Sequence, residues 1–192
     1  MSSEPVINSV GIPTAEFLQD VDAFMQKPEN NSATEVIKRL DELYMKYKFM
    51  EQNLHLKKSK LLQQYPDIEK NLEILKTLKD KHTKNEEMDA NYQLDYHLYT
   101  RAIVPPTDKV SLWLGANVML EYSIQEAEEL LNKNLIQAER SLKQIELDMD
   151  FLKDQITTTE VNMARVYNWD VRKRTVEQAS KDQTKDEQKI LE

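Results

Sequence analysis

The sequence has no cysteine, only two glycines and no long uncharged apolar run. Without thiols, disulfides and thiolate chemistry are excluded, and a zinc site would have to use other ligands. A phosphate-binding loop, a dinucleotide fingerprint and a Gly-x-Ser-x-Gly motif are all missing. No apolar run approaches the roughly 20 residues that a membrane span needs, and the first residues lack a secretory-signal pattern. We therefore expect a soluble intracellular protein.

The charge balance is acidic, with 34 Asp and Glu against 26 Lys and Arg and a formal net charge of −8. Nucleic-acid-binding domains carry a basic footprint, so we expect neither a nucleic-acid nor a membrane partner. His55, His82 and His97 have no neighbours at metal-ligand spacing, so we expect no metal. The carboxylates lie on helix faces where solvation explains them. The sequence therefore predicts neither an enzyme nor a cofactor.

Two long segments, residues 32–83 and residues 123–170, carry the apolar periodicity of coiled-coil helices. In the second segment apolar residues recur at alternating steps of three and four, and only Thr159 departs from the pattern before it stops at Val166. The first segment weakens around Pro66, and an interior proline costs about 3 kcal/mol and usually kinks a helix. The sequence predicts two long helices, the first with a loosened middle.

Each of these segments opens on a capping box, in which a serine and a glutamate satisfy free amides of the first turn. Ser32 with Glu35 forms the first box, and Ser123 with Glu126 forms the second.

The two apolar seams are equally long. Folded antiparallel, they place Leu78 beside Ile124 and Val36 beside Val166. The predicted fold is therefore mainly α: a long antiparallel two-helix coiled coil joined by a small antiparallel β insert. A two-helix rod of this kind offers no deep catalytic pocket.

The insert, residues 84–122, is predicted to hold a loop and two hairpins. Residues 110–122 are rich in β-branched, leucine and aromatic residues around a central Gly115-Ala116-Asn117 turn signal, so they fold back as a hairpin. An isolated hairpin is marginal in water. We therefore expect the insert to complete itself against other chains, as an inter-subunit β-barrel would allow.

The first part of the insert is less regular. Residues 83–91 have no period and are predicted to be a loop. Apolar residues alternate from Tyr92 to Leu98, a half-buried strand pattern. The strand from Leu98 to Val104 ends at Pro105, because proline cannot continue a ladder.

The two ends of the chain differ from the long helices. Residues 1–30 form a polar extension with a short amphipathic helix, which either packs on the coil or offers an apolar surface to a partner. Residues 171–192 are a charged tail that forms either a lone helix or a disordered segment. The apolar face of the short helix comprises Phe17, Leu18, Val21, Phe24 and Met25.

Apolar side chains remain at the free tip of the predicted coil that two helices cannot cover. Exposed apolar patches commonly mark interaction sites. Residues 14–26 either fold back over this patch or leave it accessible, and the sequence leaves both possibilities open. The hairpins pose the same question, because alternation sends apolar side chains to both sheet faces and oligomerisation through the sheet would cover them.

Three stretches of the sequence resemble the alpha class of the prefoldin family, over about residues 10–175. The hairpin motif is shared by the whole class, and the last stretch is specific to one subunit type. The stretches are Lys46-Tyr-Lys-Phe-Met50, Leu112-Trp-Leu-Gly-Ala-Asn-Val118 leading into Glu121-Tyr-Ser-Ile-Gln-Glu-Ala127, and Thr157-Thr-Thr-Glu-Val-Asn-Met-Ala-Arg-Val-Tyr-Asn-Trp-Asp170.

This resemblance implies a heterohexameric chaperone in which two alpha-class and four beta-class subunits pool their hairpins into a β-barrel body. Six coiled-coil arms would hold non-native proteins such as actin and tubulin without ATP, and would pass them to the cytosolic chaperonin. It also implies a cytoplasmic location, with the nucleus as a further one.

Carried onto this chain, the resemblance implies two surfaces. The first, the hairpin set, would make the subunit contacts: Leu98, Ile103, Leu112, Trp113, Leu114, Val118, Leu120 and Tyr122. The second, the tip set, would hold clients: Val36, Ile37, Leu40, Tyr44, Val166, Tyr167, Trp169 and Val171.

The alternative function is a structural tether or scaffold built on the same antiparallel hairpin of helices. Heptads alone do not separate a tether from a chaperone arm. The β insert favours the chaperone, because a plain tether needs only a short loop at that place.

Overall fold

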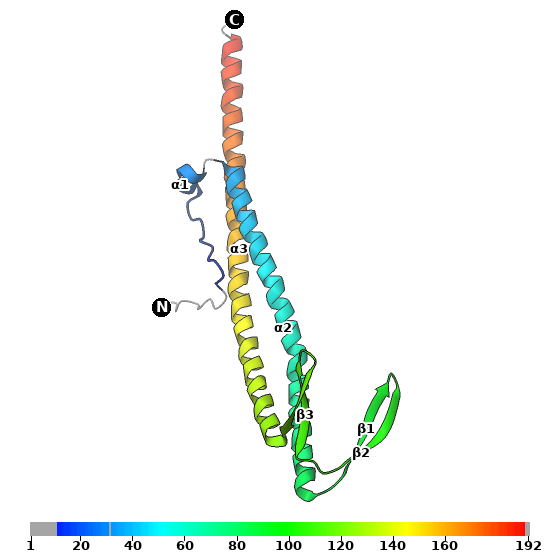
Figure 1. Ribbon diagram of the computed structural model, residues 1–192. Helices are drawn as coiled ribbons and strands as arrows, with labels where there is room; N and C mark the ends of the chain where they lie inside the picture. The colour runs from blue at the N-terminus through cyan, green and yellow to red at the C-terminus, as the bar shows by residue number, and fades with distance from the viewer. Residues whose placement is uncertain (1–10, 31, 191–192) are drawn as a thin grey trace. The chain divides into compact units, whose positions relative to one another are not determined.

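The computed structural model of the chain describes residues 11–30 and 32–190, with residues 181–190 described by their backbone alone (Figure 1). Its described residues form two compact units, those within 1–56 together with those within 144–192, and residues 57–143. Among the described residues, no helix has a stretch long and apolar enough to cross a membrane.

The chain is mainly α-helical with two small antiparallel hairpins between two long helices, which confirms the predicted fold class. The long helices are α2, Ala33–Lys84, and α3, Ile124–Ile190. A short helix α1, Val21–Met25, and a 3-10 turn η1, Pro28–Asn30, precede them. The strands are β1 Met88–Asp95, β2 Leu98–Val104, β3 Lys109–Gly115 and β4 Val118–Ser123.

Helix α2 begins and ends close to its predicted bounds. The carbonyl of Ser32 accepts a hydrogen bond from the amide of Val36 at 3.1 Å, so Ser32 stands at the N-cap position that its motif predicts. Pro66 lies inside α2, which is helical on both sides of it. A proline removes one donor from the helical ladder, and the flanking residues keep theirs. The proline therefore does not divide this helix.

Helix α3 continues past residue 170, where the second long segment was predicted to end. Its backbone is helical through Ile190, which decides between the two possibilities left open for the tail as far as that residue. The seam itself stops at Val166, because Val171 and Val176 beyond it are exposed. Lysine, glutamate, glutamine and arginine have high helix propensity, and neither glycine nor proline follows residue 115. The helix therefore propagates after its packing partner has ended.

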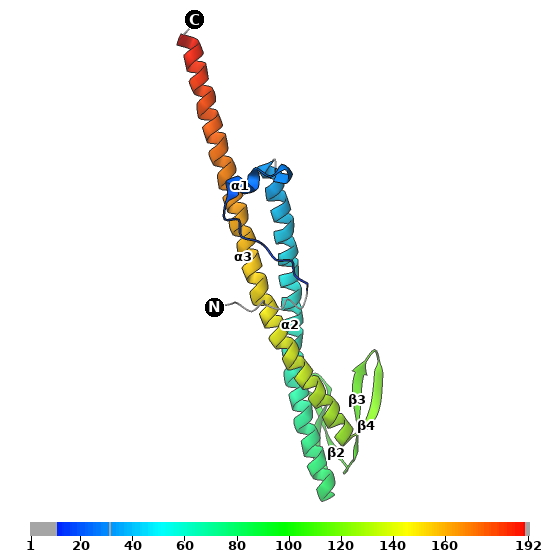
Figure 2. The ribbon, with the colours of Figure 1, turned by 90° about the vertical axis from the view of Figure 1, so that its left-hand side faces the viewer.

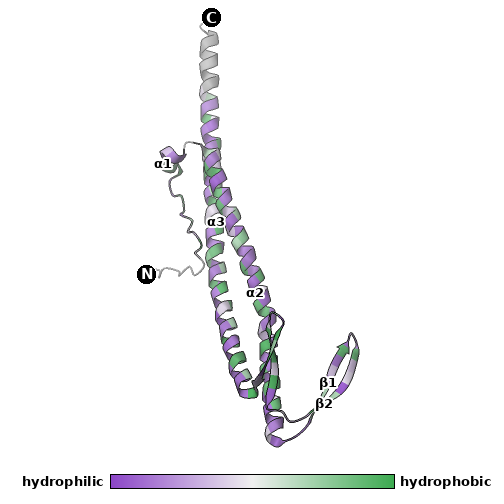
Figure 3. Ribbon diagram, viewed as in Figure 1, coloured by the Kyte–Doolittle hydropathy of each residue, from purple (hydrophilic) through white to green (hydrophobic). Residues whose placement is uncertain are grey.

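In the first unit, α2 and α3 pair through the predicted apolar seam. Val36 and Val166 are buried in one cluster, as the antiparallel arrangement predicts, and Met25 of α1 joins them. Tyr47 of α2 and Leu152 of α3 are fully buried further along the seam. Figure 3 shows apolar positions recurring along both long helices between polar ones. Burial of this stripe is the main favourable term that holds the pair together.

In the second unit, the helices pair again and the β3–β4 hairpin packs on them. Leu78 lies against the cluster that contains Ile124, which is the predicted pairing. One side of the hairpin contributes Val110, Leu112 and Tyr122 to this core. The buried members of the cluster are Leu72, Leu75, Ile124, Ala127 and Leu131.

The two hairpins are separate two-stranded antiparallel sheets. In the second hairpin Gly115 pairs with Val118, and Ala116 and Asn117 form the turn with φ of 48° and 61°. Positive φ at both central residues is the geometry that suits the twist of a tight hairpin, so the predicted turn signal is confirmed. A register shift between Trp113 and Gly115 marks a bulge just before the turn.

The first hairpin corrects two predictions. β1 begins at Met88, inside the stretch 83–91 that was predicted to be a loop. The stretch from Tyr92 to Leu98 is not one strand, because Asp95 pairs with Leu98 across a turn in which His97 has a φ of 62°. The carboxylate of Asp95 accepts a hydrogen bond from the amide of Tyr96 at 2.7 Å, a local side-chain contact that favours a turn. Apolar residues keep alternating across this turn, so the sequence pattern did not reveal the turn.

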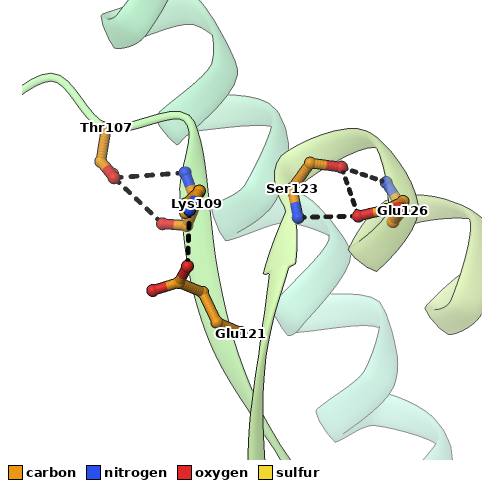
Figure 4. Close-up of polar contacts among 5 residues, drawn as sticks. All are labelled: Thr107, Lys109, Glu121, Ser123 and Glu126. Carbon is orange, nitrogen blue, oxygen red and sulfur yellow. Dashed lines mark hydrogen bonds and ion pairs between the residues drawn. The ribbon is translucent and has the colours of Figure 1, made fainter.

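The predicted capping box at the start of α3 is present (Figure 4). The amide of Glu126 donates to Ser123 Oγ at 3.2 Å, while the amide and hydroxyl of Ser123 donate to Glu126 Oε2 at 3.0 and 2.8 Å. These bonds to the serine side chain and backbone lower the pKa of Glu126. The bonds between Ser123 and Glu126 join the end of β4 to the start of α3. Next to them, Lys109 Nζ of β3 pairs with Glu121 Oε1 of β4 at 2.7 Å (Figure 4).

Replacing Ser123 by alanine is expected to destabilise the second unit by about 1 kcal/mol, the usual cost of losing an N-cap. Because the folded pKa of Glu126 is lowered, the capping contribution is present above the unfolded pKa of the glutamate. It is lost as the pH falls through the folded pKa. Urea denaturation followed by circular dichroism at neutral pH and at pH about 3 measures both effects. Ser111→Ala, on an exposed strand position, is the matched control; an equal loss for S123A at both pH values would contradict the prediction.

Candidate functional site

The hairpin set lies in the second unit and is largely uncovered. Leu112 and Tyr122 are half-buried and pack on the helical core. The other six members are exposed, Trp113 to 61 % of its surface and Ile103 to 63 %. The members that remain open are Leu98, Ile103, Trp113, Leu114, Val118 and Leu120.

Further exposed apolar and aromatic side chains continue this surface beyond the predicted set. Such a concentration on two short sheets exceeds the scattered apolar residues of an ordinary surface. Each two-stranded sheet also leaves backbone groups unpaired along its outer edges. The arrangement is suited to association with other chains through strand pairing and apolar packing. The additional residues are Tyr92, Leu94, Tyr96, Tyr99 and Met119.

A groove of ≈ 380 Å³ lies beneath β3 in the same unit. One wall is the strand from Val110 to Leu114, and the opposite wall comes from α2 and α3. Ile74 of α2 and Leu130 of α3 line it, so it is largely apolar. No general acid, base or nucleophile converges there, and within the described part of the chain no three metal-ligating side chains gather.

The tip set lies in the first unit and is only partly accessible. Tyr167 and Val171 are exposed, to 60 % and 44 % of their surfaces. Val36 and Val166 are buried, which corrects the expectation that they form an open client surface: they are core residues of the helix pair. The half-buried members are Ile37, Leu40, Tyr44 and Trp169.

Part of the tip set is covered by the lead, the name used here for residues 11–25. Leu18, Val21 and Phe24 pack against the cluster formed by Val36 and Val166, so residues 14–26 do fold back over the helices. Figures 1 and 2 show the lead running alongside the helix pair to α1. Of the two possibilities left open for the short helix, the structure has the one in which it packs on the coil.

Two buried amides of α3 hold the lead by its backbone. Gln155 Oε1 accepts from the amide of Ala15 at 2.7 Å. Asn162 accepts from the amide of Leu18 at 2.9 Å and donates to the carbonyl of Glu16 at 2.8 Å. Asn162 is only 2 % exposed, so its amide would be costly to leave unpaired.

Three more side chains complete the attachment of the lead. Tyr47 Oη donates to the carbonyl of Pro13 at 2.7 Å, and burial raises the pKa of this phenol. Arg165 donates to the carbonyl of Gln19 at 2.9 Å. Trp169 Nε1 donates to the carboxylate of Asp22 at 2.5 Å.

Gln155 and Asn162 did not emerge from the sequence as functional residues, although a signal for them exists. Together with Asp148 and Trp169 they recur at seven-residue steps beside the apolar seam of α3. Asp148, Gln155 and Asn162 are all buried. A buried polar residue is normally hydrogen-bonded, so a polar lane on a buried helix face indicates a polar partner there. The sequence prediction used only the apolar seam of this helix and did not include the polar lane beside it.

Among the described residues, the polar groups around the tip set form no catalytic arrangement. A side-chain hydrogen bond to Glu160 is the main cause that raises the pKa of Tyr44. A cavity of ≈ 520 Å³ lies between the end of the lead and α3, and Arg165 and Arg172 line it. These groups can bind and orient a polypeptide, but they supply no activated nucleophile or paired acid and base.

The sequence of the chain is similar to those of known proteins. Residues 47–169 match the family model described as prefoldin subunit. Prefoldin subunit 3 of Mus musculus is 56 % identical over 172 residues, which cover 90 % of this chain and 88 % of that protein. Prefoldin subunit 3 of Homo sapiens is 56 % identical over 90 % of this chain and 87 % of its own length. The Drosophila melanogaster prefoldin subunit 3 is 51 % identical over 85 % of this chain and 83 % of its length.

Asn162→Ala is expected to loosen the lead without unfolding the helix pair. It removes two hydrogen bonds to the lead, together about 2 kcal/mol, which raises the open population about 30-fold. Chymotrypsin cleavage after Phe17, which is 50 % exposed, reports that opening. Asn132→Ala, the same change at an exposed site of α3, is the control. Equal cleavage rates for both variants would show that the amide does not hold the lead.

Proposed function

Because the chain belongs to the prefoldin family, we propose that it is an alpha-class subunit, of the subunit 3 type, in a heterohexameric molecular chaperone. The proposed complex contains a second alpha-class subunit and four beta-class subunits. It captures unfolded and nascent polypeptides without ATP. Catalysis plays no part in this function, and no cofactor is needed.

The observation that carries the proposal is the uncovered apolar surface of the two hairpins. Two-stranded sheets are marginal by themselves, and most of the hairpin set is exposed in the single chain. Pairing of strand edges between subunits would satisfy the open backbone groups and bury Trp113 and its neighbours. We infer that the hairpins of the subunits close into a common β-barrel body.

The helix pair would then project from the body and present the tip set to clients. Weak apolar contacts at several tips combine into useful avidity, because each bound tip raises the effective concentration of the others. We propose non-native actin and tubulin as clients and the cytosolic chaperonin as the acceptor. We also propose a cytoplasmic site of action, with the nucleus as a further one. A tether built from the same helices would not need the hairpin set.

Assembly is the first test. Co-expressed with its five partner subunits, the chain is expected to form one stable complex that slows aggregation of a chemically denatured client without nucleotide. Trp113→Asp should prevent incorporation, because a carboxylate would have to be buried in the new core. Native mass spectrometry measures incorporation.

Two controls define that experiment. Trp113→Phe should still assemble, and Ile136→Asp, a charge placed on an exposed apolar site of α3, should leave assembly intact. Incorporation of W113D at the wild-type level would refute the role of the hairpin set. A chain that never joins the partners would favour the tether.

Client holding is the second test. Tyr167→Ala combined with Val171→Ala is expected to leave the assembled complex intact and to weaken its retention of denatured actin several-fold, since both side chains are exposed members of the tip set. Leu147→Ala with Val161→Ala removes a similar exposed apolar area elsewhere on α3. Fluorescence anisotropy of labelled client compares the two double variants; equal retention would remove the tip set from the client surface.

A further inference from the structure

The first part of the lead, residues 13–19, is bound largely through its backbone. The groove that holds it, called here the backbone groove, is lined by Tyr47, Gln155, Asn162 and Arg165. The five hydrogen bonds described above from these side chains to the lead end on peptide groups, whereas Trp169 beside them binds the Asp22 carboxylate. They alternate between carbonyls and amides along the chain, which is the pattern that an extended peptide offers whatever its sequence. The peptide groups belong to Pro13, Ala15, Glu16, Leu18 and Gln19.

The side chains of the lead place few demands on this groove. Thr14, Glu16 and Phe17 are exposed, whereas Ile12 is buried and Leu18 is half-buried against the helices. An occupant therefore needs free peptide groups and an apolar residue every few positions. An unfolded protein segment with apolar residues at this spacing meets these conditions, and a folded protein, with its amides already paired, does not.

An empty backbone groove would leave two buried amide side chains without their partners in the lead. Gln155 and Asn162 are 7 % and 2 % exposed, and no buried side-chain nitrogen or oxygen among the described residues is left without a partner. Removing the lead would leave these amides dependent on water and would uncover the apolar cluster around Val36 and Val166. Because the lead is tethered to α2, it refills the groove at high effective concentration.

We propose that the backbone groove is a binding site for extended polypeptide, filled by the chain's own lead at rest and by a segment of a non-native protein during capture. This inference rests on the proposed chaperone function and assigns it a second, backbone-directed contact. The lead then raises the apparent dissociation constant for client, which equals the intrinsic constant divided by the fraction of time that the groove is empty. Only a client segment that replaces both its apolar contacts and its peptide hydrogen bonds displaces it.

Hydrogen exchange on the assembled complex tests the exchange of occupants. In the resting complex the amides of Ala15 and Leu18 are protected by their bonds to α3. Saturation with denatured actin is expected to speed deuterium uptake at both amides about tenfold. The amide of Val36 at the start of α2 serves as an internal control and should not change. Captured client with unchanged protection at Ala15 and Leu18 would overturn the inference while leaving the proposed function intact.

A peptide competition tests the recognition itself. A synthetic peptide of residues 11–25 should displace labelled client from a complex whose subunit lacks residues 2–26. The same peptide with N-methyl groups on Ala15 and Leu18 should compete at least tenfold more weakly, because it lacks both donors. Equal competition by the two peptides would show that apolar contact alone fills the groove, which would overturn the inference.

If the shortened subunit does not assemble, Asn162→Ala in the full chain replaces it, with Asn132→Ala as control. N162A should accelerate exchange at Leu18 at rest and should reduce the further acceleration that client causes there, whereas N132A should leave both as in the wild-type complex. A client-induced acceleration at Leu18 as large in N162A as in the wild type would overturn the inference. A complex that captures no client at all would overturn the proposed function, and this inference with it.

Discussion

Two packed helices bury only the stripe along which they touch, so apolar side chains beside that stripe have to be covered by other parts of the structure. In the first unit the stripe contains Val36, Tyr47, Leu152 and Val166, all nearly or fully buried. Apolar groups beside it need other cover, and the lead supplies that cover for the cluster near Val36. In the second unit the β3–β4 hairpin covers one side of the helices and is itself left open on the other. A chain with this architecture leaves apolar surface that a partner has to cover.

The buried polar residues Gln155 and Asn162 of α3 determine which kind of segment packs beside them. An apolar lane at Gln155 and Asn162 would have held a second helix, whose backbone is already hydrogen-bonded internally. Amides at these positions instead hold an extended segment, because only such a segment has free peptide groups to offer. The sequence tolerance that we propose for the groove follows from the same physics.

Local signals account for most of the correct sequence predictions. The Ser123–Glu126 capping box, the turn at Ala116-Asn117 and the two seams each depend on residues close in sequence or on a simple period. The errors arose where the same sequence pattern is compatible with two different structures. Alternation from Tyr92 to Leu98 continued across a turn, and the loss of the seam after Val166 was taken as the end of a helix that in fact continues.

The residues alone were sufficient to establish the two long helices, their antiparallel pairing and the second hairpin, because each follows from spacing along the chain. The family resemblance rested on three sequence motifs. The residues alone did not reveal that residues 11–25 lie over Val36 and Val166, or that Gln155 and Asn162 bind peptide groups more than a hundred residues away in sequence. Such contacts depend on which surfaces remain uncovered once the helices have paired. That is a property of the folded unit, and it makes Val36 and Val166, two members of the tip set, part of the core.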